Sequence, residues 1–332
     1  MRRGLLSYAL ILTLVISGFA AAVFALNNDL YSAAGFVRSY LSALERHDAR
    51  AALAFDGVVV PASASPKLMT DAALGDLAGF RLISDLPADD DARGDGAPGD
   101  QRVVRFATVI AGEEHTTEFH VERSGTRFGL FAIWRFAVSP VATLEISADN
   151  DDRATANGVE LTVGTYPVLV PTLIAVDHDS KYLEADAVTV AVVEVGGRER
   201  GAIGVVAKPE LDKAAHIAVN AYLDDCVTQH VLKPTGCPMS ETILNRVNDT
   251  PEWSLETYPE VALEPGTTPG EWRSANATGL ATVTVEVKSI LDGTLSRIDE
   301  SVYFSAVYVV AIGQDDSLSV TVDFATLGGF TG

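Results

Sequence analysis

The densest group of side chains that could do chemistry lies in one short segment, Glu113–His120. It carries glutamates and histidines, the side chains that proteins use for general acid–base catalysis and as metal ligands. Because side chains alternate between the two faces of a strand, Glu118 and His120 share one face and His115 lies on the other. Phe119 then points toward the core. We therefore interpret the polar pair as the solvated face of a strand.

A second acidic stretch, Asp149–Asp152 followed by Glu160, imitates the two ends of a calcium-binding loop. Arg153 at the fifth position and Ala154 where the loop needs glycine break the pattern, so we predict a turn between strands. The sequence holds no P-loop, no G-x-S-x-G, no H-E-x-x-H and no G-x-G-x-x-G. We expect no catalytic residues, no metal site and no cofactor, and hence a protein that is not an enzyme.

The chain has two cysteines, Cys226 and Cys237. Outside the cytoplasm, a pair so close in sequence is most simply a disulfide. Free thiols are one alternative. A zinc site that adds His216 and His230 is another, although this spacing matches no common zinc finger.

The first 26 residues predict a membrane anchor. Arg2 and Arg3 precede an uncharged run from Gly4 to Leu26, and a helix of that length crosses the roughly 30 Å hydrocarbon core of a bilayer. Representative residues of the predicted transmembrane helix are Leu5, Ile11, Val15, Phe19 and Phe24. The two arginines predict a cytoplasmic N-terminus. We therefore expect a single-pass protein of the cytoplasmic membrane, with everything from about Asn27 onward outside. A cleaved signal peptide is the alternative, and it exports the same part of the chain.

The charge balance restricts the partners. The formal net charge is −21; without Arg2 and Arg3, 22 basic residues face 45 acidic ones. Such a surface repels nucleic acid and anionic lipid headgroups. We expect the lipid bilayer to be a partner through the N-terminal helix alone, and we expect no nucleic acid.

Periodicity predicts helices first and then a sheet. Apolar residues from Phe36 to Leu44 recur at helical spacing, and Asp48 is a candidate N-cap for a second short helix that runs to Phe55. Next comes a short strand near residues 79–84, and a polar loop fills residues 85–100. Three longer strands are expected at residues 102–110, 116–122 and 127–136, the last with Phe128, Leu130, Ala132, Trp134 and Phe136 on one face.

The rest of the chain predicts two further parts. Short β-like runs with Asn, Asp and Gly turns fill residues 140–208, which we take as a small all-β module. A helical stripe from Leu211 to Cys226 follows, then a short helix near residues 241–247 and strands at 252–263, 271–289, 300–312 and 317–324. The predicted domains are residues 1–27 (cytoplasmic tip and anchor), 28–139 (α+β), 140–208 (β) and 209–332 (a second α+β unit with a Cys loop).

The segment FVRSYLSALERHDARAALAF (Phe36–Phe55), with the sheet-forming runs after it, resembles the start of the NTF2-like/cystatin-like fold. An anchor, two such units and a β module with a G-x-Y-P element (Gly164–Pro167) resemble TcaA-like membrane proteins of the bacterial, in particular actinobacterial, cell envelope. The Cys loop DDCVTQHVLKPTGCP (Asp224–Pro238) is similar to one in actinobacterial envelope proteins. The resemblance implies an α+β fold class and a non-catalytic role in binding an envelope protein or wall polymer. An NTF2-like cone can also hold a small ligand or an active site, for which Tyr31, Tyr40, Asp56 and Trp134 are the candidates.

Overall fold

The computed structural model describes residues 2–88 and 100–323, and for residues 2–11 and 28 it describes the backbone alone. The chain is a mixed α+β protein in which sheets predominate. It divides into two compact units. Unit 1 holds residues 1–147, 153–177 and 187–203, and unit 2 holds residues 148–152, 178–186 and 204–332. The domain boundaries predicted from the sequence stay predictions.

Unit 1 begins with three helices, α1 (Arg2–Asn28), α2 (Ala33–Glu45) and α3 (Ala49–Leu53). Each of the last two has the cap that its sequence favours. The Ser32 hydroxyl accepts a hydrogen bond from the Gly35 amide at 2.9 Å, and the Asp48 carboxylate accepts one from the Ala51 amide at 2.8 Å. These bonds satisfy amides that a helix start leaves without partners. The predicted cap at Asp48 is therefore confirmed, and the two 3₁₀ turns that follow α3 are η1 (Pro66–Leu68) and η2 (Asp71–Ala73).

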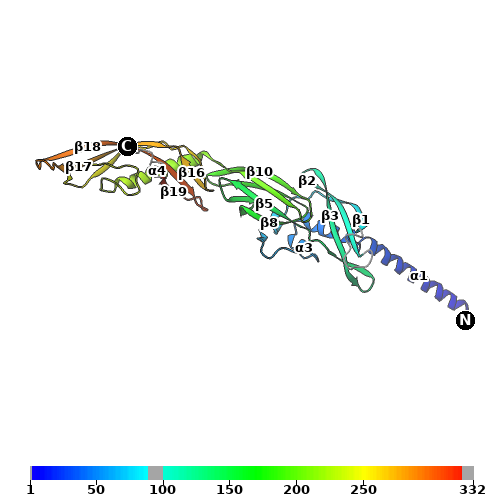
Figure 1. Ribbon diagram of the computed structural model, residues 1–332. Helices are drawn as coiled ribbons and strands as arrows, with labels where there is room; N and C mark the ends of the chain where they lie inside the picture. The colour runs from blue at the N-terminus through cyan, green and yellow to red at the C-terminus, as the bar shows by residue number, and fades with distance from the viewer. Residues whose placement is uncertain (1, 89–99, 324–332) are drawn as a thin grey trace. The chain divides into compact units, whose positions relative to one another are not determined.

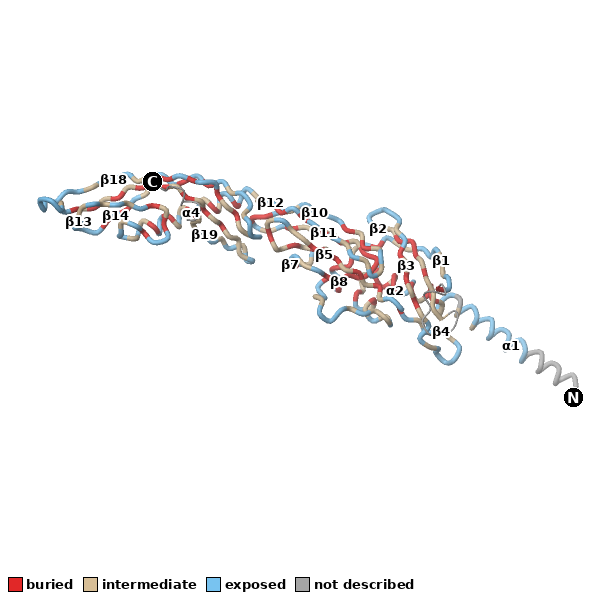
Figure 2. The backbone as a smooth tube through the Cα atoms, viewed as in Figure 1, coloured by how far each residue is buried: buried red, intermediate tan, exposed pale blue. Residues whose placement is uncertain are grey.

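The described part of α1 is exposed along its length (Figure 2). Val15, Phe19 and Phe24 are among its exposed apolar side chains. Leu5 and Ile11 lie outside the side chains that the structure describes. Among the residues that could be searched, no helix is both long enough and apolar enough to cross a membrane.

A four-stranded antiparallel meander in the order β1-β2-β3-β4 packs against α2 (Figure 2). Its strands are β1 (Phe80–Pro87), β2 (Gln101–Ile110), β3 (Glu113–Arg127) and β4 (Phe131–Phe136). The predicted alternation holds on β3, where Phe119 and Val121 are buried and Glu118 and His120 are partly exposed. Most of the predicted polar loop at residues 85–100 lies outside the described residues, although residues 85–87 belong to β1.

The β3–β4 turn lies further along the chain than predicted. Residues 128–130 form the turn, so Phe128 and Leu130 do not continue a strand face with Trp134. Phe128 has φ 55° and Gly129 has φ 67°, and the Leu130 amide donates to the Arg127 carbonyl at 3.2 Å. Positive φ at two successive residues is the left-handed backbone that tight hairpin turns use. The sequence pattern was misleading because aromatic residues occupy both the turn and the strand.

The β module contributes most of its strands to unit 1. These strands form two small sheets, one in the order β10-β9-β6-β7 and one in the order β11-β5-β8. The bounds are β5 (Val141–Asp149), β6 (Arg153–Ala156), β7 (Val159–Thr162), β8 (Gly164–Leu169), β9 (Thr172–Asp179), β10 (Leu183–Val192) and β11 (Arg198–Gly204). Residues 170 and 171 lie between β8 and β9, and their peptide bond is cis.

One apolar core runs through unit 1. It joins buried residues of α2 and α3 to the inner face of the β1–β4 meander, and it includes Leu169 at the end of β8. Val141, Ala191 and Val193 from the β module pack against the same core. Residues of the predicted α+β domain (28–139) and of the predicted β module (140–208) thus share one core in this unit.

The described residues of unit 2 form one helix, α4 (Pro209–Val227), and a sheet built on the long β17–β18 hairpin (Figure 1). The predicted apolar stripe is confirmed for five residues of α4 that are buried: Leu211, Ala215, Val219, Leu223 and Cys226. The short strand β12 (Val206–Ala207) pairs with Leu183 and Glu184 at the start of β10. The strands of the β17–β18 sheet are β13 (Arg246–Val247), β14 (Glu252–Thr257), β15 (Leu263–Pro265), β16 (Glu271–Ser274), β17 (Ala277–Lys288), β18 (Leu295–Ile312) and β19 (Leu318–Asp323). Phe324, predicted as the last strand residue, lies outside the described residues.

The prediction of a short helix near residues 241–247 is wrong. Residues 241–245 have no regular structure, and Arg246 and Val247 form β13 by pairing with Lys288 and Val287. Leu244 is almost fully exposed, so no apolar face is available to hold a helix there.

Candidate functional site

Glu118 and His120 do share the outer face of β3, as predicted. His120 Nε2 lies 3.1 Å from Glu118 Oε1, and Arg105 Nε lies 2.7 Å from Glu118 Oε2. The cross-strand register that pairs Arg105 with Glu118 produces this second contact. The carboxylate therefore carries a cation on each side once His120 is protonated.

A groove of about 590 Å³ opens over this face. Thr116, Glu118 and His120 line one side of the groove, whereas three valines, Val138, Val193 and Val195, and the exposed Glu194 line the other. The Glu118 and His120 side chains are each about two-fifths exposed, at 39% and 40%. Both side chains are thus open to water, and Arg105 already contacts the Glu118 carboxylate. The groove suits a surface contact with a mixed polar and apolar partner.

The four residues proposed for a cone interior do not meet in a cavity. Tyr40 is fully buried and donates its hydroxyl to the Val170 carbonyl at 3.0 Å. Its ring packs edge-on against Phe55 and Phe136, with centroid distances of 5.8 and 5.1 Å. Asp56 is exposed. Aromatic rings therefore occupy the space in which a ligand of this unit would sit.

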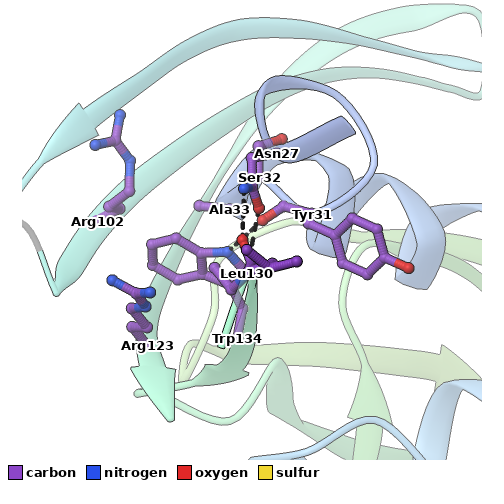
Figure 3. Close-up of a pocket in the computed structure, with 9 residues that line it drawn as sticks. Asn27, Tyr31, Ser32, Ala33, Arg102, Arg123, Leu130 and Trp134 are labelled. Carbon is purple, nitrogen blue, oxygen red and sulfur yellow. Dashed lines mark hydrogen bonds between the residues drawn. The ribbon is translucent and has the colours of Figure 1, made fainter. Parts of the chain in front are cut away.

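Tyr31 and Trp134 do come together, but at the surface. Trp134 Nε1 donates to the Tyr31 carbonyl at 2.9 Å, and beside this bond lies an open pocket of about 400 Å³ (Figure 3). Asn27, in the last turn of α1, donates to the Leu130 carbonyl at 2.7 Å and accepts from the Ala132 amide at 3.4 Å. The pocket thus lies between the end of α1 and β4.

Two arginines give this pocket its charge. Figure 3 shows the Arg102 and Arg123 side chains on the same side of the Trp134 ring, while the Tyr31 ring points away from them. Arg102 is held by the Asp85 carboxylate and donates to the Asp85 carbonyl at 2.9 Å. Within residues 12–27, 29–88 and 100–323, the Arg123 guanidinium has no carboxylate partner. The pocket can therefore attract an anionic group such as a phosphate or a carboxylate.

Sequence reasoning missed Asn27, Arg102 and Arg123 as neighbours. Arg102 and Arg123 lie near the same end of two paired strands, and β-strand register alone could have suggested that they are close. Nothing in the sequence indicates that Asn27 bonds to the main chain of β4, because that contact depends on how the end of α1 packs.

The cysteine prediction is confirmed. Cys226 and Cys237 form a disulfide with an S–S distance of 2.09 Å, and both lie in the core of unit 2. Zinc binds deprotonated thiolates, and here the two sulfurs are bonded to each other. His230, named for the zinc alternative, has its Nδ1 3.2 Å from the Pro251 carbonyl. Among the described residues, no cluster of three or more His, Cys, Asp or Glu side chains is arranged to hold a metal ion.

The calcium-like segment is a turn, as predicted. It connects β5 to β6, with Asn150 at φ 67°. The Asn150 side chain donates to the Val205 carbonyl at 2.9 Å, and Asp152 accepts from Gln314 at 3.0 Å. These polar groups therefore hold unit 2 together rather than surrounding an empty cation site.

The sequence matches no protein-family model, no curated protein and no solved structure at a significant level. The protein is therefore classified by its architecture alone. It is a β-rich α+β protein of two units, and its first helix is apolar and exposed. Its function has to be inferred from the geometry of this chain.

Proposed function

We propose that this chain is a membrane-anchored extracytoplasmic protein that binds a cell-envelope partner, either a protein or a wall polymer, and does not catalyse a reaction. The observation that carries the proposal is the helix α1. It presents large apolar side chains such as Val15, Phe19 and Phe24 outward, and its first two residues are Arg2 and Arg3. An exposed apolar helix needs a nonpolar environment, and basic residues at its N-terminal end favour a cytoplasmic N-terminus.

Two further features support this placement. The Cys226–Cys237 disulfide is of the kind that forms and persists in oxidising compartments outside the cytoplasm. The strongly acidic chain, with a net charge of −21, favours solubility in water beside the membrane. The helix pair α2–α3 packed on the β1–β4 meander supports an NTF2-like assignment for the first part, and the TcaA-like relationship remains part of the same proposal.

The binding role is supported by how the chemically capable residues are used. Glu118 is engaged by Arg105 and His120 on an open face, and the interior around Tyr40 is filled by aromatic rings. The alternative is a small-ligand carrier or enzyme with a cavity inside the first unit. It has less support, because aromatic rings fill the interior around Tyr40. What the fold offers a partner is its exterior, including the groove beside Val138 and Val195.

The test is site-specific photocrosslinking of the full chain in intact cells. A photoreactive residue replaces Thr116 in the groove, Leu291 at the β17–β18 turn of unit 2, or the exposed Thr189 on β10 as the control. We expect a discrete adduct from at least one of the first two positions and none from Thr189. Adducts of equal yield at all three positions, or none at any, would contradict a specific envelope partner.

A further inference from the structure

The β3–β4 turn carries an aromatic side chain where the backbone disfavours one. Phe128 occupies the left-handed region at φ 55°, which asparagine, aspartate and glycine tolerate and bulky residues avoid. Its side chain has no compensating burial, because the residue is 80% exposed. Leu130, at the other side of the turn, is 44% exposed. Neither the backbone conformation nor burial accounts for a phenylalanine at this position, so its presence points to a role in contact with something else.

The turn is fixed beside the end of α1. The Asn27 side chain holds both the Leu130 carbonyl and the Ala132 amide, and the Tyr31 ring stacks on Phe131 with a centroid distance of 4.5 Å. The helix end next to it also exposes apolar groups, since Phe24 is 69% exposed and Leu30 is 67% exposed. These side chains lie near the end of α1, where the helix would leave a bilayer.

The turn end of this hairpin is basic, unlike the chain as a whole. From Arg123 to Phe136 the sequence has three arginines and no acidic residue, in a protein whose net charge is −21. Arg135 forms an ion pair with Glu122 of β3, so the basic character of the turn end comes from Arg123 and Arg127. Arg127 lies over the Phe128 ring, with its guanidinium carbon 5.5 Å from the ring centroid. Arg123 borders the open pocket next to Trp134. Arginines beside exposed aromatic and leucine side chains are the composition of segments that settle at the headgroup level of a membrane.

We propose that the β3–β4 turn, Arg127–Leu130, docks on the bilayer that holds α1. Phe128 and Leu130 enter the boundary between headgroups and acyl chains, and Arg123 and Arg127 contact lipid phosphates. The inference rests on the proposed anchor, because the Asn27 contacts place the turn at the membrane surface only if α1 crosses the membrane. If the turn docks in this way, unit 1 is attached to the membrane at two points, α1 and the β3–β4 turn. Its orientation relative to the membrane is then restricted.

The experiment uses the full chain reconstituted in vesicles of phosphatidylcholine and phosphatidylglycerol. Both native cysteines are in the disulfide, so Phe128→Cys provides a single thiol for an environment-sensitive NBD dye. The matched control is Glu113→Cys, which is exposed at the opposite end of the same 15-residue strand, about 45 Å away at the usual rise per residue. Spin-labelled lipid quenches a dye inside the bilayer, and aqueous iodide quenches a dye in water.

We expect the dye at position 128 to be blue-shifted and quenched several-fold more by the lipid-borne quencher than the dye at position 113. Vesicles of phosphatidylcholine alone should reduce that difference, because they lack the net negative charge that attracts the arginines. A dye at position 128 that behaves like the one at position 113, in protein that floats with the vesicles after a high-salt wash, overturns the docked turn and leaves the anchor intact. Protein that washes off the vesicles overturns the anchor and the docked turn together. Circular dichroism equal to that of the parent chain shows that each variant is folded.

Discussion

Replacing Tyr40 by phenylalanine removes a single oxygen atom from the centre of unit 1. The ring and its contacts with Phe55 and Phe136 remain, and the hydrogen bond to the Val170 carbonyl, 3.0 Å long, is lost. The carbonyl loses this donor in a buried site, where a missing partner costs about 1–3 kcal/mol. Because no ring volume is lost, no cavity term is added, and we expect Tyr40→Phe to reduce the free energy of unfolding by about 1.5 kcal/mol.

The same residue makes unit 1 sensitive to alkali. Burial raises the pKa of the Tyr40 hydroxyl far above its usual value of 10.0, so the folded state keeps this proton when the unfolded state loses it. The stabilisation is complete below pH 10 and declines as the pH rises above it, by about 1.4 kcal/mol per pH unit for one tyrosine. Tyr40→Phe should abolish this part of the alkaline slope.

Hydrogen exchange measured by mass spectrometry separates the two units in one experiment. Tyr40→Phe should increase exchange in α2 and in the strands of unit 1 and leave α4 and the β17–β18 hairpin unchanged. The matched control is Tyr303→Phe, at a residue that is 76% exposed, for which we expect a change below about 0.5 kcal/mol. Equal losses in both units, or an unchanged alkaline slope, would refute the role given to this hydroxyl.

Three further predictions concern other parts of the chain. Replacing both Cys226 and Cys237 by alanine opens a loop with a sequence separation of 11 and should cost unit 2 about 3 kcal/mol in denaturant unfolding; a loss below about 1 kcal/mol would contradict the loop-closure argument. Phe128→Asn should raise the free energy of unfolding by about 1 kcal/mol, because asparagine tolerates the left-handed backbone; a lower melting temperature would show that Phe128 supports the fold. The hydrogen bond from Lys208 and its charge hold the pKa of Asp179 below the usual 3.8, so the stability this pair supplies is present above that value and lost as the pH falls through the lower folded value. Lys208→Met should therefore destabilise unit 2 more at neutral pH than in acid, where the Lys208 bond to the Ser180 carbonyl, 2.6 Å long, is still lost, and a difference that does not shrink in acid would disprove the assignment.

The elements that the sequence predicts well are those fixed by neighbours along the chain. The cap at Asp48 and the buried stripe of α4 depend on residues within one or two turns of a helix, and both are confirmed. The alternation of Phe119 and Val121 with Glu118 and His120 depends on the period of a strand, and it too is confirmed. Local patterns carry this information because the spacing itself decides which face is buried.

The elements that the sequence predicts poorly depend on tertiary contacts. Phe128 and Leu130 read as strand residues because β-propensity cannot reveal a turn that places an aromatic side chain in water. The segment at residues 241–247 has helix-forming residues, but pairing of Arg246 and Val247 with β17 decides its structure. The Arg123 pocket was missed because its lining comes from α1, β2, β3 and β4, whose proximity follows only from the packed fold.

The central claim, that the packed units lie outside a membrane that α1 crosses, is tested most directly by labelling Glu113→Cys in intact cells from which the wall has been removed. A maleimide that cannot cross membranes reports which side the residue faces, and an alkaline carbonate wash reports whether the chain is embedded. The account predicts full labelling before lysis and a chain that remains in the membrane pellet. Labelling only after lysis, or release of the chain by carbonate, would contradict it.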